Sequence, residues 1–271
     1  AVTQIARVGR AMPMYFAGVV EVLRDEPRAV PTLLLGPHNI LQGTLKIDYS
    51  FPSYDSPDHV LVEYTNPNTW APQTVACAMQ GSARQRPKTV QLNGVIDRDQ
   101  AFREGMYMIA CHRDQRKFVT LQVEMEGYIP RYGDRIDISH DTPAWGLSGT
   151  IVDYQPQTGL LTSSEPLAWY AGQSHYVALR ARDGSAQGPY RVTQGADLHQ
   201  MVLQGLGEAQ LKALWISDGQ HEEATFYQFG PGNQQAQSCL LLRATPQGHD
   251  QVELYMVNYA PSVYLAEVNA D

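Results

Sequence analysis

The sequence predicts an α+β fold in which strands predominate, with a small antiparallel β-barrel as one of its parts. The first observation is an apolar stripe at helical spacing that follows Asp97, a residue suited to cap a helix. The second is the strict alternation of apolar and polar residues that replaces this stripe from residue 119 onward. The third is a series of short alternating runs joined by turn residues, which favours a barrel or sandwich over a parallel sheet.

The N-terminal part, residues 1–54, is expected to be an incomplete α+β segment. Its first ten residues have the pattern of the end of a helix, with Ile5 and Val8 on one side. Strand-like runs follow in order along the chain at residues 14–23, 30–35, 45–51, 59–65, 74–79 and 89–95. Most of them are separated by Pro, Asn, Asp or Ser residues, which favour turns.

The central helix is predicted to begin after Asp97 and to end near Arg113. Gln100 lies where a capping box places Glu or Gln, and Gly105 belongs to the apolar stripe. Basic residues near the C-terminal end suit the negative end of the helix dipole. The strand after the helix is expected to direct one set of side chains inward and the other outward; the inward set is Val119, Leu121, Val123 and Met125, and the outward set includes Glu124 and Glu126.

A turn at Gly133–Asp134 is predicted to lead into the barrel, which we place at residues 133–195. A hairpin is expected between residues 151–154 and 159–162, and Asp183–Gly184 is a strong turn signal because both residue types tolerate positive φ. Beyond the barrel, residues 197–206 and 208–214 carry short helical patterns. Strand patterns then return at residues 225–229, 239–245 and 251–259.

Several of these runs resemble the tip attachment protein (host specificity protein J) family of long-tailed bacteriophages. The resemblance is carried by residues 97–126 and 127–167, and it continues, in the same order, in residues 59–70, 226–247 and 252–264. It implies that residues 55–132 and 196–271 are the two halves of a hub-type domain with a helix. An inserted barrel, residues 133–195, would interrupt that domain.

The resemblance also implies a function, which is the structural hub of a bacteriophage or prophage tail tip or baseplate. Such a hub closes the tail tube and supports host-attachment domains. The expected partners are two further copies in a homotrimer and other proteins of the tail tip and tail tube. The expected location is the virion tail tip, and the host cytoplasm during assembly. The absence of Met at position 1 suggests a piece of a longer polypeptide.

An alternative interpretation is a carbohydrate-binding, adhesin-like module. Its candidate contacts for a glycan or a protein partner are the loop aromatics Trp145, Trp169 and Tyr170. These rings could equally cap the ends of a small barrel. A glycan array with a Trp145→Ala control would separate the two interpretations.

Composition excludes several other classes of protein. A formal net charge of −8 argues against non-specific binding of nucleic acid, which depends on clustered Lys and Arg. The odd number of cysteines, 3, with no close spacing predicts free buried thiols rather than disulfides or a zinc site. Apolar runs are too short to span a bilayer, and no signal peptide opens the sequence.

No pattern in the sequence predicts catalysis, a metal site or a cofactor. Ser139-His140-Asp141 has the composition of a catalytic triad, but neighbouring strand residues point to opposite faces and cannot form the relay. His221-Glu222-Glu223 lacks the paired histidines of a zinc protease helix. Glu124 and Glu126 share a predicted exposed face, where both would be ionised. The chain is therefore predicted not to be an enzyme.

Overall fold

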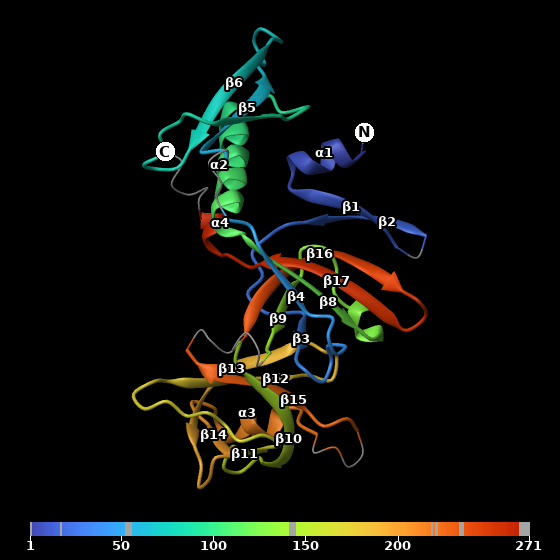
Figure 1. Cartoon of the computed structure of the whole chain (residues 1–271), viewed down its shortest axis with the longest axis vertical. Coiled ribbons are helices and arrows are strands. Elements are labelled where there is room, and N and C mark those ends of the chain that lie inside the picture. Colours follow the sequence, from blue (N-terminus) through green and yellow to red (C-terminus); the bar gives the residue numbers. More distant parts are fainter. Residues whose placement is uncertain are drawn as a thin grey trace. The chain divides into compact units, whose positions relative to one another are not determined.

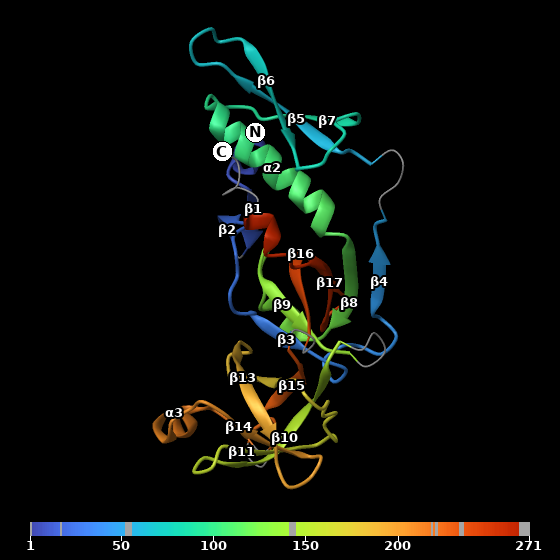
Figure 2. The same ribbon diagram turned by 90° about the vertical axis from the view of Figure 1, so that its left-hand side faces the viewer.

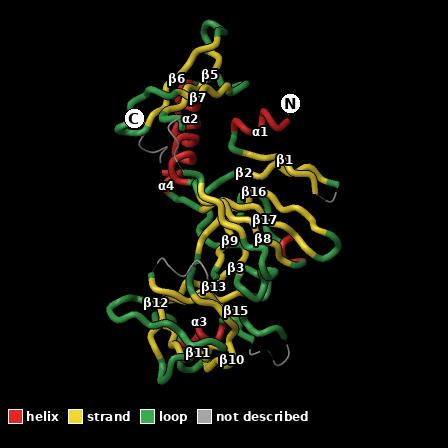
Figure 3. The backbone as a smooth tube through the Cα atoms, viewed as in Figure 1, coloured by secondary structure: helices red, strands yellow, loops and turns green. Residues whose placement is uncertain are grey.

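Strands make up most of the secondary structure, and only one of the described helices is long (Figure 3). The computed structural model describes residues 2–16, 18–51, 56–140, 145–217, 219, 222–232 and 236–265. It has the predicted class: the chain is mostly β, and a closed six-stranded antiparallel barrel stands among open sheets. The chain forms two compact units, each built from separate stretches of sequence. The first comprises Ala1–Pro27, Ile47–Phe118 and Val257–Asp271, and the second comprises Arg28–Lys46 and Val119–Met256.

In the first unit, the long helix α2 packs on a three-stranded sheet (Figure 1). The sheet has the order β6–β5–β7, with β5 at His59–Thr65, β6 at Pro72–Ala78 and β7 at Pro87–Gln91. β5 alternates as predicted, and its buried residues Val60, Val62 and Tyr64 share a core with apolar residues of α2. The sheet therefore has one face covered by the helix.

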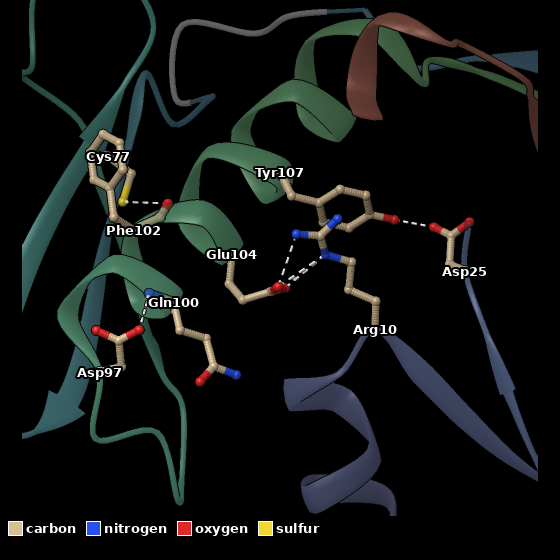
Figure 4. Close-up of polar contacts among 8 residues, drawn as sticks. All are labelled: Arg10, Asp25, Cys77, Asp97, Gln100, Phe102, Glu104 and Tyr107. Atoms are coloured by element: carbon tan, nitrogen blue, oxygen red, sulfur yellow. Dashed lines mark hydrogen bonds and ion pairs between the residues drawn. The ribbon is translucent and has the colours of Figure 1, made fainter. Parts of the chain in front are cut away.

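Helix α2 spans Arg98–Asp114, as its sequence pattern predicts. The Asp97 carboxylate accepts the N–H groups of Asp99 and Gln100 at 3.1 and 3.3 Å, which confirms it as the N-cap. Figure 4 shows the contact with Gln100. Gly105 faces the sheet at very short range, because a Cβ at this position would lie 2.2 Å from the Cys77 sulfur. A helix-weakening glycine is therefore used here to let the helix approach β6 closely.

The remaining elements of the first unit come from the two ends of the sequence. They are the helix α1 (Val2–Val8), the antiparallel ribbon of β1 (Ala11–Phe16) and β2 (Val19–Arg24), and the short helix α4 (Ser262–Leu265). The predicted strand at residues 14–23 is wrong, because the chain reverses near Gly18, whose φ of 86° is easily reached only by glycine.

The second unit contains most of a six-stranded sheet of order β3–β9–β16–β17–β8–β4 (Figure 2). Its strands are β3 (Leu33–Leu35), β4 (Lys46–Tyr49), β8 (Lys117–Val123), β9 (Arg135–Ile138), β16 (Gln237–Gln247) and β17 (Gln251–Asn258). β9 lies between β3, to which it is parallel, and β16, to which it is antiparallel. Its core takes Val119, Leu121 and Val123 from the predicted inward set.

The barrel follows β9 and precedes β16, so it is inserted between two strands that are paired in the sheet. Its closed order is β10–β11–β14–β13–β12–β15, and all neighbouring strands are antiparallel. The strands are β10 (Leu147–Gln155), β11 (Leu160–Ser163), β12 (His175–Arg180), β13 (Ala186–Gln194), β14 (Gln200–Leu203) and β15 (Phe226–Pro231). The short helix α3 (Glu208–Ala213) lies between β14 and β15 in sequence.

The barrel differs in extent from the predicted 133–195. β9 belongs to the open sheet, and β14 and β15 complete the barrel after residue 195. The helical pattern predicted at residues 197–206 is wrong, because Met201 and Leu203 are buried barrel residues on the strand β14. A four-residue strand is too short a window to separate a period of 2 from one of 3.6.

The strand after α2 is shorter than predicted. β8 ends at Val123, and Met125–Tyr128 form a turn of 3₁₀ helix in which Met125 is 58% exposed. Met125 therefore does not share the buried face of β8, and Glu126 leaves the strand for an ion pair described below. An ideal Cβ on Gly127 would lie 2.7 Å from Val123 and Val252 side-chain atoms, so the turn is packed tightly on the sheet.

Candidate functional site: the barrel mount and the α2 network

Two groups of buried contacts, most of them polar, hold this fold together at points where distant parts of the sequence meet. We call the first the barrel mount, formed by Gln228, the Arg180–Glu126 pair and the Phe226–Gly36 contact. We call the second the α2 network, formed by Arg10, Asp25, Glu104, Tyr107 and Tyr264.

Gln228 is the central residue of the barrel mount. It lies on β15 of the barrel and is only 1% exposed. Its Nε2 donates to the carbonyl oxygens of Leu35 and Asp137, each at 3.0 Å. Leu35 ends β3 and Asp137 lies on β9, so one barrel side chain binds two adjacent strands of the open sheet. Buried carbonyl groups need such partners, because they have lost their water.

The other two contacts of the mount add charge and steric fit. Arg180 of β12 donates to the Glu126 carboxylate at 2.7 Å, and the two side chains are 17% and 15% exposed. Gly36 lies directly against Phe226, since an ideal Cβ on the glycine would be 2.3 Å from the ring. Leu34, Ala178 and Phe226 form a small apolar core at the same place. The barrel is therefore packed against the sheet and not merely tethered to it.

The α2 network joins the N-terminal ribbon and the C-terminal helix to α2. Figure 4 shows its contacts among Arg10, Asp25, Glu104 and Tyr107. Arg10 donates three hydrogen bonds of 2.9–3.0 Å to the Glu104 carboxylate. Its guanidinium group also lies 4.2 Å from the centre of the Tyr107 ring. The hydroxyl groups of Tyr107 and Tyr264 both donate to the Asp25 carboxylate, the second at 2.6 Å.

Burial gives this network its strength. The side chains of Arg10 and Glu104 are 9% and 10% exposed, so each charge depends on the other for the solvation that water would provide. Burial, followed by the neighbouring Cys111 and Asp25, raises the pKa of Tyr107 far above its usual value. Burial and Asp25 raise the pKa of Tyr264 as well. Both tyrosines therefore remain protonated donors to Asp25. Arg10 adopts a φ of 55°, a conformation that a non-glycine residue rarely takes.

The three aromatic residues predicted as possible partner or glycan contacts do not form one surface. Trp145 packs against the core of the six-stranded sheet. Trp169 packs against the barrel core, with its ring centre 4.9 Å from those of His175 and Phe229. Tyr170, 53% exposed, stacks on His175 at 6.0 Å. The structure therefore brings Trp169 and Tyr170 together around His175, away from the core that Trp145 joins.

His175 is held as a neutral ring in this aromatic group. It is 3% exposed, and its Nε2 accepts the N–H of Tyr170 at 3.1 Å. Burial lowers the pKa of His175, which is the expected effect on a ring that becomes charged on protonation. The geometry supports packing at the end of the barrel, and the exposed face of Tyr170 remains open to a ligand.

The acidic and triad patterns of the sequence do not form a reactive cluster among the described residues. Ser139 is fully buried, and its hydroxyl group donates to the Leu35 carbonyl oxygen at 3.4 Å. His140 forms an isolated bridge with Trp145, and Asp141 and His221 lie outside the described residues. Glu126 is bound to Arg180, so it does not form an exposed pair with Glu124 as predicted.

Within the described part of the chain, no group of three or more His, Cys, Asp or Glu side chains is placed to hold a metal ion. The three cysteines are free; Cys77 and Cys239 are buried and Cys111 is half-buried. Among the described helices, none has both the length and the apolar character needed to cross a membrane.

Sequence reasoning missed the residues of both polar groups. Arg10 and Glu104 are 94 positions apart, and Gln228 and Leu35 are 193 apart. The available signals were weak: a glutamate inside an apolar helical stripe, and a glutamine between the apolar residues Tyr227 and Phe229 of a short strand. Each signal indicates a polar side chain with a buried partner, but neither names that partner.

Comparison with solved structures gives a distant structural likeness. No protein-family model matches the sequence, and no curated protein sequence matches it significantly. Among solved structures, the tail protein from Neisseria meningitidis MC58 is similar to this chain, with a TM-score of 0.40 and 12% sequence identity. The aligned region covers 98% of this chain and 56% of that protein, so the chain spans little more than half of its length. At this TM-score, nothing about function is transferred from that protein.

Proposed function

We propose that the chain is a structural component of a bacteriophage or prophage tail, in the hub of the tail tip or baseplate. There it would close the tail tube and support host-attachment domains, and it would not act as an enzyme. The observation that carries this proposal is the insertion of the barrel between β9 and β16. The segments that resemble host specificity protein J predict such a guest barrel, entered after a helix, a strand and a Gly–Asp turn. The pairing of Gln237 with Ile138 and of Leu240 with Arg135 is the return of the chain to the same sheet.

We further propose that the working assembly is a homotrimer that also binds other tail tip and tail tube proteins. Exposed apolar side chains on the ribbon of β1 and β2 support this assignment. Val19, Val20 and Val22 of β2 are 57–62% exposed, and neighbouring strand residues point to opposite faces, so apolar side chains are open on both faces. A two-stranded ribbon is marginally stable on its own, and strands from other copies would cover its faces and edges.

The experiment is light scattering of the full-length protein over a range of concentrations, together with antibody labelling of particles produced from its phage or prophage. The proposal predicts a trimer and a label at the tail tip. Val20→Lys on β2 should reduce the trimer fraction. Val152→Lys on the barrel, a valine of similar exposure at 53%, serves as the matched control. A strictly monomeric full-length protein that is absent from particles would refute the proposal.

The carbohydrate-binding alternative is favoured by one specific observation, the half-exposed ring of Tyr170 stacked on His175. Exposed aromatic rings held in a fixed orientation are suited to stacking on sugars. A glycan array tests this alternative with the Tyr170→Ala, Trp169→Ala and Trp145→Ala variants. A specific signal lost in the Tyr170 variant would support it, whereas the hub proposal expects no specific signal.

A further inference from the structure

A short loop of the barrel is bound by a buried histidine. We call it the His175 loop, and it comprises residues 168–173, which lie between β11 and β12 in the sequence. Leu167 fixes the start of the loop, because its N–H donates to the Leu198 carbonyl oxygen at 2.8 Å. Ser174 fixes the end, because its carbonyl oxygen accepts the N–H of the residue that follows β15 at 2.9 Å. A movement of the loop would therefore be confined to the residues between these two anchors.

The His175 ring binds the backbone of this loop. Its Nε2 accepts the N–H of Tyr170 at 3.1 Å, and the ring forms a further hydrogen bond with the Gln173 backbone. The N–H of Gln173 donates to the Tyr170 carbonyl oxygen at 3.2 Å, so the two residues form one turn over the ring. Nε2 can accept a hydrogen bond only while it carries no proton. The contact that holds Tyr170 therefore depends on the protonation state of His175.

Aromatic rings enclose His175. The rings of Phe229 and Tyr170 are nearly parallel to it, at 10° and 6°, with ring centres 5.4 and 6.0 Å away. The Trp169 ring is tilted, and its centre lies at 4.9 Å. The indole N–H of Trp169 is buried without a hydrogen-bond partner among the described residues. A buried donor of this kind costs free energy, which opening of the loop to water would recover.

The elements packed against His175 supply no charged partner for its ring within the described part of the barrel. Residues 166–174 and β15 contain no Asp, Glu, Lys or Arg. On β13, the buried Val192 pairs with His175, whereas the neighbouring Arg191 is exposed. Tyr170 is the titratable side chain of the loop itself. A protonated His175 would therefore lack a carboxylate to compensate its charge while the loop is closed.

We propose that the His175 loop is an acid-sensitive flap, which opens when His175 becomes protonated. In the protonated ring both nitrogens are donors, so Nε2 would face the Tyr170 N–H as donor to donor. Opening removes this conflict and lets water solvate both the charged ring and the Trp169 N–H. It also uncovers the His175 and Phe229 rings. This proposal requires neither the hub assignment nor the carbohydrate-binding alternative.

The sign of the pH response follows from the burial of the ring. Burial lowers the pKa of His175 in the closed form, whereas a solvated ring in the open form has the ordinary value of about 6.5. The open form therefore binds the proton more readily, and the closed form is most stable above pH ~6.5. Between the two pKa values, each pH unit of acidification should favour opening by about tenfold.

The test is NMR of the whole chain from about pH 7.5 to about pH 4.5, a range that brackets the ordinary histidine pKa of about 6.5. Ring nitrogen shifts should show the neutral tautomer with its proton on Nδ1, as an accepting Nε2 requires. Hydrogen exchange of the Tyr170 amide, relative to its intrinsic rate at each pH, reports opening. Its protection should fall by about tenfold for each pH unit below the open-state pKa. The Leu167 amide at the anchor should stay protected.

His175→Gln separates protonation from packing, because the side-chain oxygen of glutamine can accept the Tyr170 N–H at every pH. This variant should keep the loop closed and lose the pH dependence. The matched control is His199→Gln, which replaces a half-buried histidine beside β14 whose Nδ1 lies 3.1 Å from the Ser163 carbonyl oxygen. The control should respond to pH as the wild type does.

Several results would overturn the proposal, and those on the wild type do not depend on whether a variant folds. One is a neutral ring with its proton on Nε2. Another is protection of the Tyr170 amide that stays constant over the whole pH range, whether or not the ring becomes protonated. An equal loss of protection at Leu167 would indicate general acid unfolding instead of a flap. The same pH response in His175→Gln as in the wild type would exclude His175 as the trigger.

Discussion

Replacing Gln228 by leucine tests whether the barrel mount holds the barrel against the sheet. The two side chains are similar in volume, but leucine cannot donate to the carbonyl groups of Leu35 and Asp137. Each lost hydrogen bond costs about 0.5–1.5 kcal/mol, and leaving a buried acceptor without its partner adds about 1–3 kcal/mol. Leu35 O keeps the N–H of Ser139 at 2.9 Å, which limits the second contribution. We therefore expect the free energy of unfolding of the second unit to fall by about 2–4 kcal/mol.

Urea unfolding followed by circular dichroism and tryptophan fluorescence measures this change. The matched control is Gln204→Leu, which removes an exposed barrel amide that donates to the Thr193 hydroxyl group at 3.0 Å. This control should change stability by less than about 0.5 kcal/mol. If the Gln228 and Gln204 variants lose equal stability, the mount has no special role and the reasoning fails.

A Gln228→Glu variant adds a test in which the stability of the folded state should depend on pH. A carboxylate facing two carbonyl oxygens in a buried site has its folded-state pKa raised above the unfolded value of about 4.3. The protonated acid can still donate one hydrogen bond, so the variant should be most stable below pH ~4. Its stability should then fall as pH rises through the raised folded-state pKa. A stability difference from the wild type that is constant between acidic and neutral pH would contradict this account of the site.

Three further predictions concern the first unit. Arg10→Met or Glu104→Leu alone should lower the free energy of unfolding by about 3–5 kcal/mol, because each leaves a buried charge without its partner. The double variant should lose much less, because it leaves no buried charge. A double-mutant cycle in urea measures the difference, and additive losses would contradict this reasoning. Gly105→Ala should destabilise the protein by about 1–3 kcal/mol, because the new methyl group meets Cys77, although alanine has the better helix propensity. Thermal unfolding measures this change, and a gain in stability would refute the close approach of α2 to β6. The side-chain hydrogen bond with His59 is the largest of several interactions that strongly lower the pKa of the Asp58 carboxyl group. The ionised Asp58 carboxylate therefore stabilises the folded state above the unfolded pKa of about 3.9, and this stabilisation is lost as pH falls through the folded-state pKa. Asp58→Asn should remove that part of the acid sensitivity in a pH-dependent melting series.

Local patterns in the sequence predicted those features of the fold that depend only on neighbouring residues, such as helix caps, strand alternation and turns. The Asp97 cap needs only the first turn of α2, and the burial of Val60, Val62 and Tyr64 follows from the period of two in β5. The turn at Asp183–Gly184 follows from the tolerance of Gly184 for its φ of 86°. These features depend on neighbours within a few residues, so the sequence contains all the information they need.

The extent of the barrel could not be predicted in the same way. β14 and β15 join the barrel through pairing with β11, β13, β10 and β12, which lie earlier in the sequence. The alternation of Met201 and Leu203 covers only a single four-residue strand. Closing a barrel depends on which edges remain open after the other strands have paired, and this property is not encoded in any one window of sequence.

The polar groups were hidden for a related reason. A buried arginine or glutamine is recognisable only when its partner is known, and Arg10 and Gln228 find partners far away in the sequence. Trp145 and Trp169 were both predicted to be loop aromatics that could contact a glycan or a protein partner. They belong to two separate cores, which only the three-dimensional pairing of the strands determines.

The way in which the barrel is attached bears on what the chain can do. Because β9 and β16 are paired, the chain leaves the sheet and returns to it at neighbouring positions. An inserted domain of this kind can still pivot if its connections are its only attachment. Here Gln228, Arg180 and Phe226 each bind or pack against the sheet domain, so a pivot would break two buried hydrogen bonds, one ion pair and an apolar contact. Force applied to the barrel would therefore pass into the sheet, which suits the tail-hub role proposed above and which a receptor-binding domain on a flexible tether would not need.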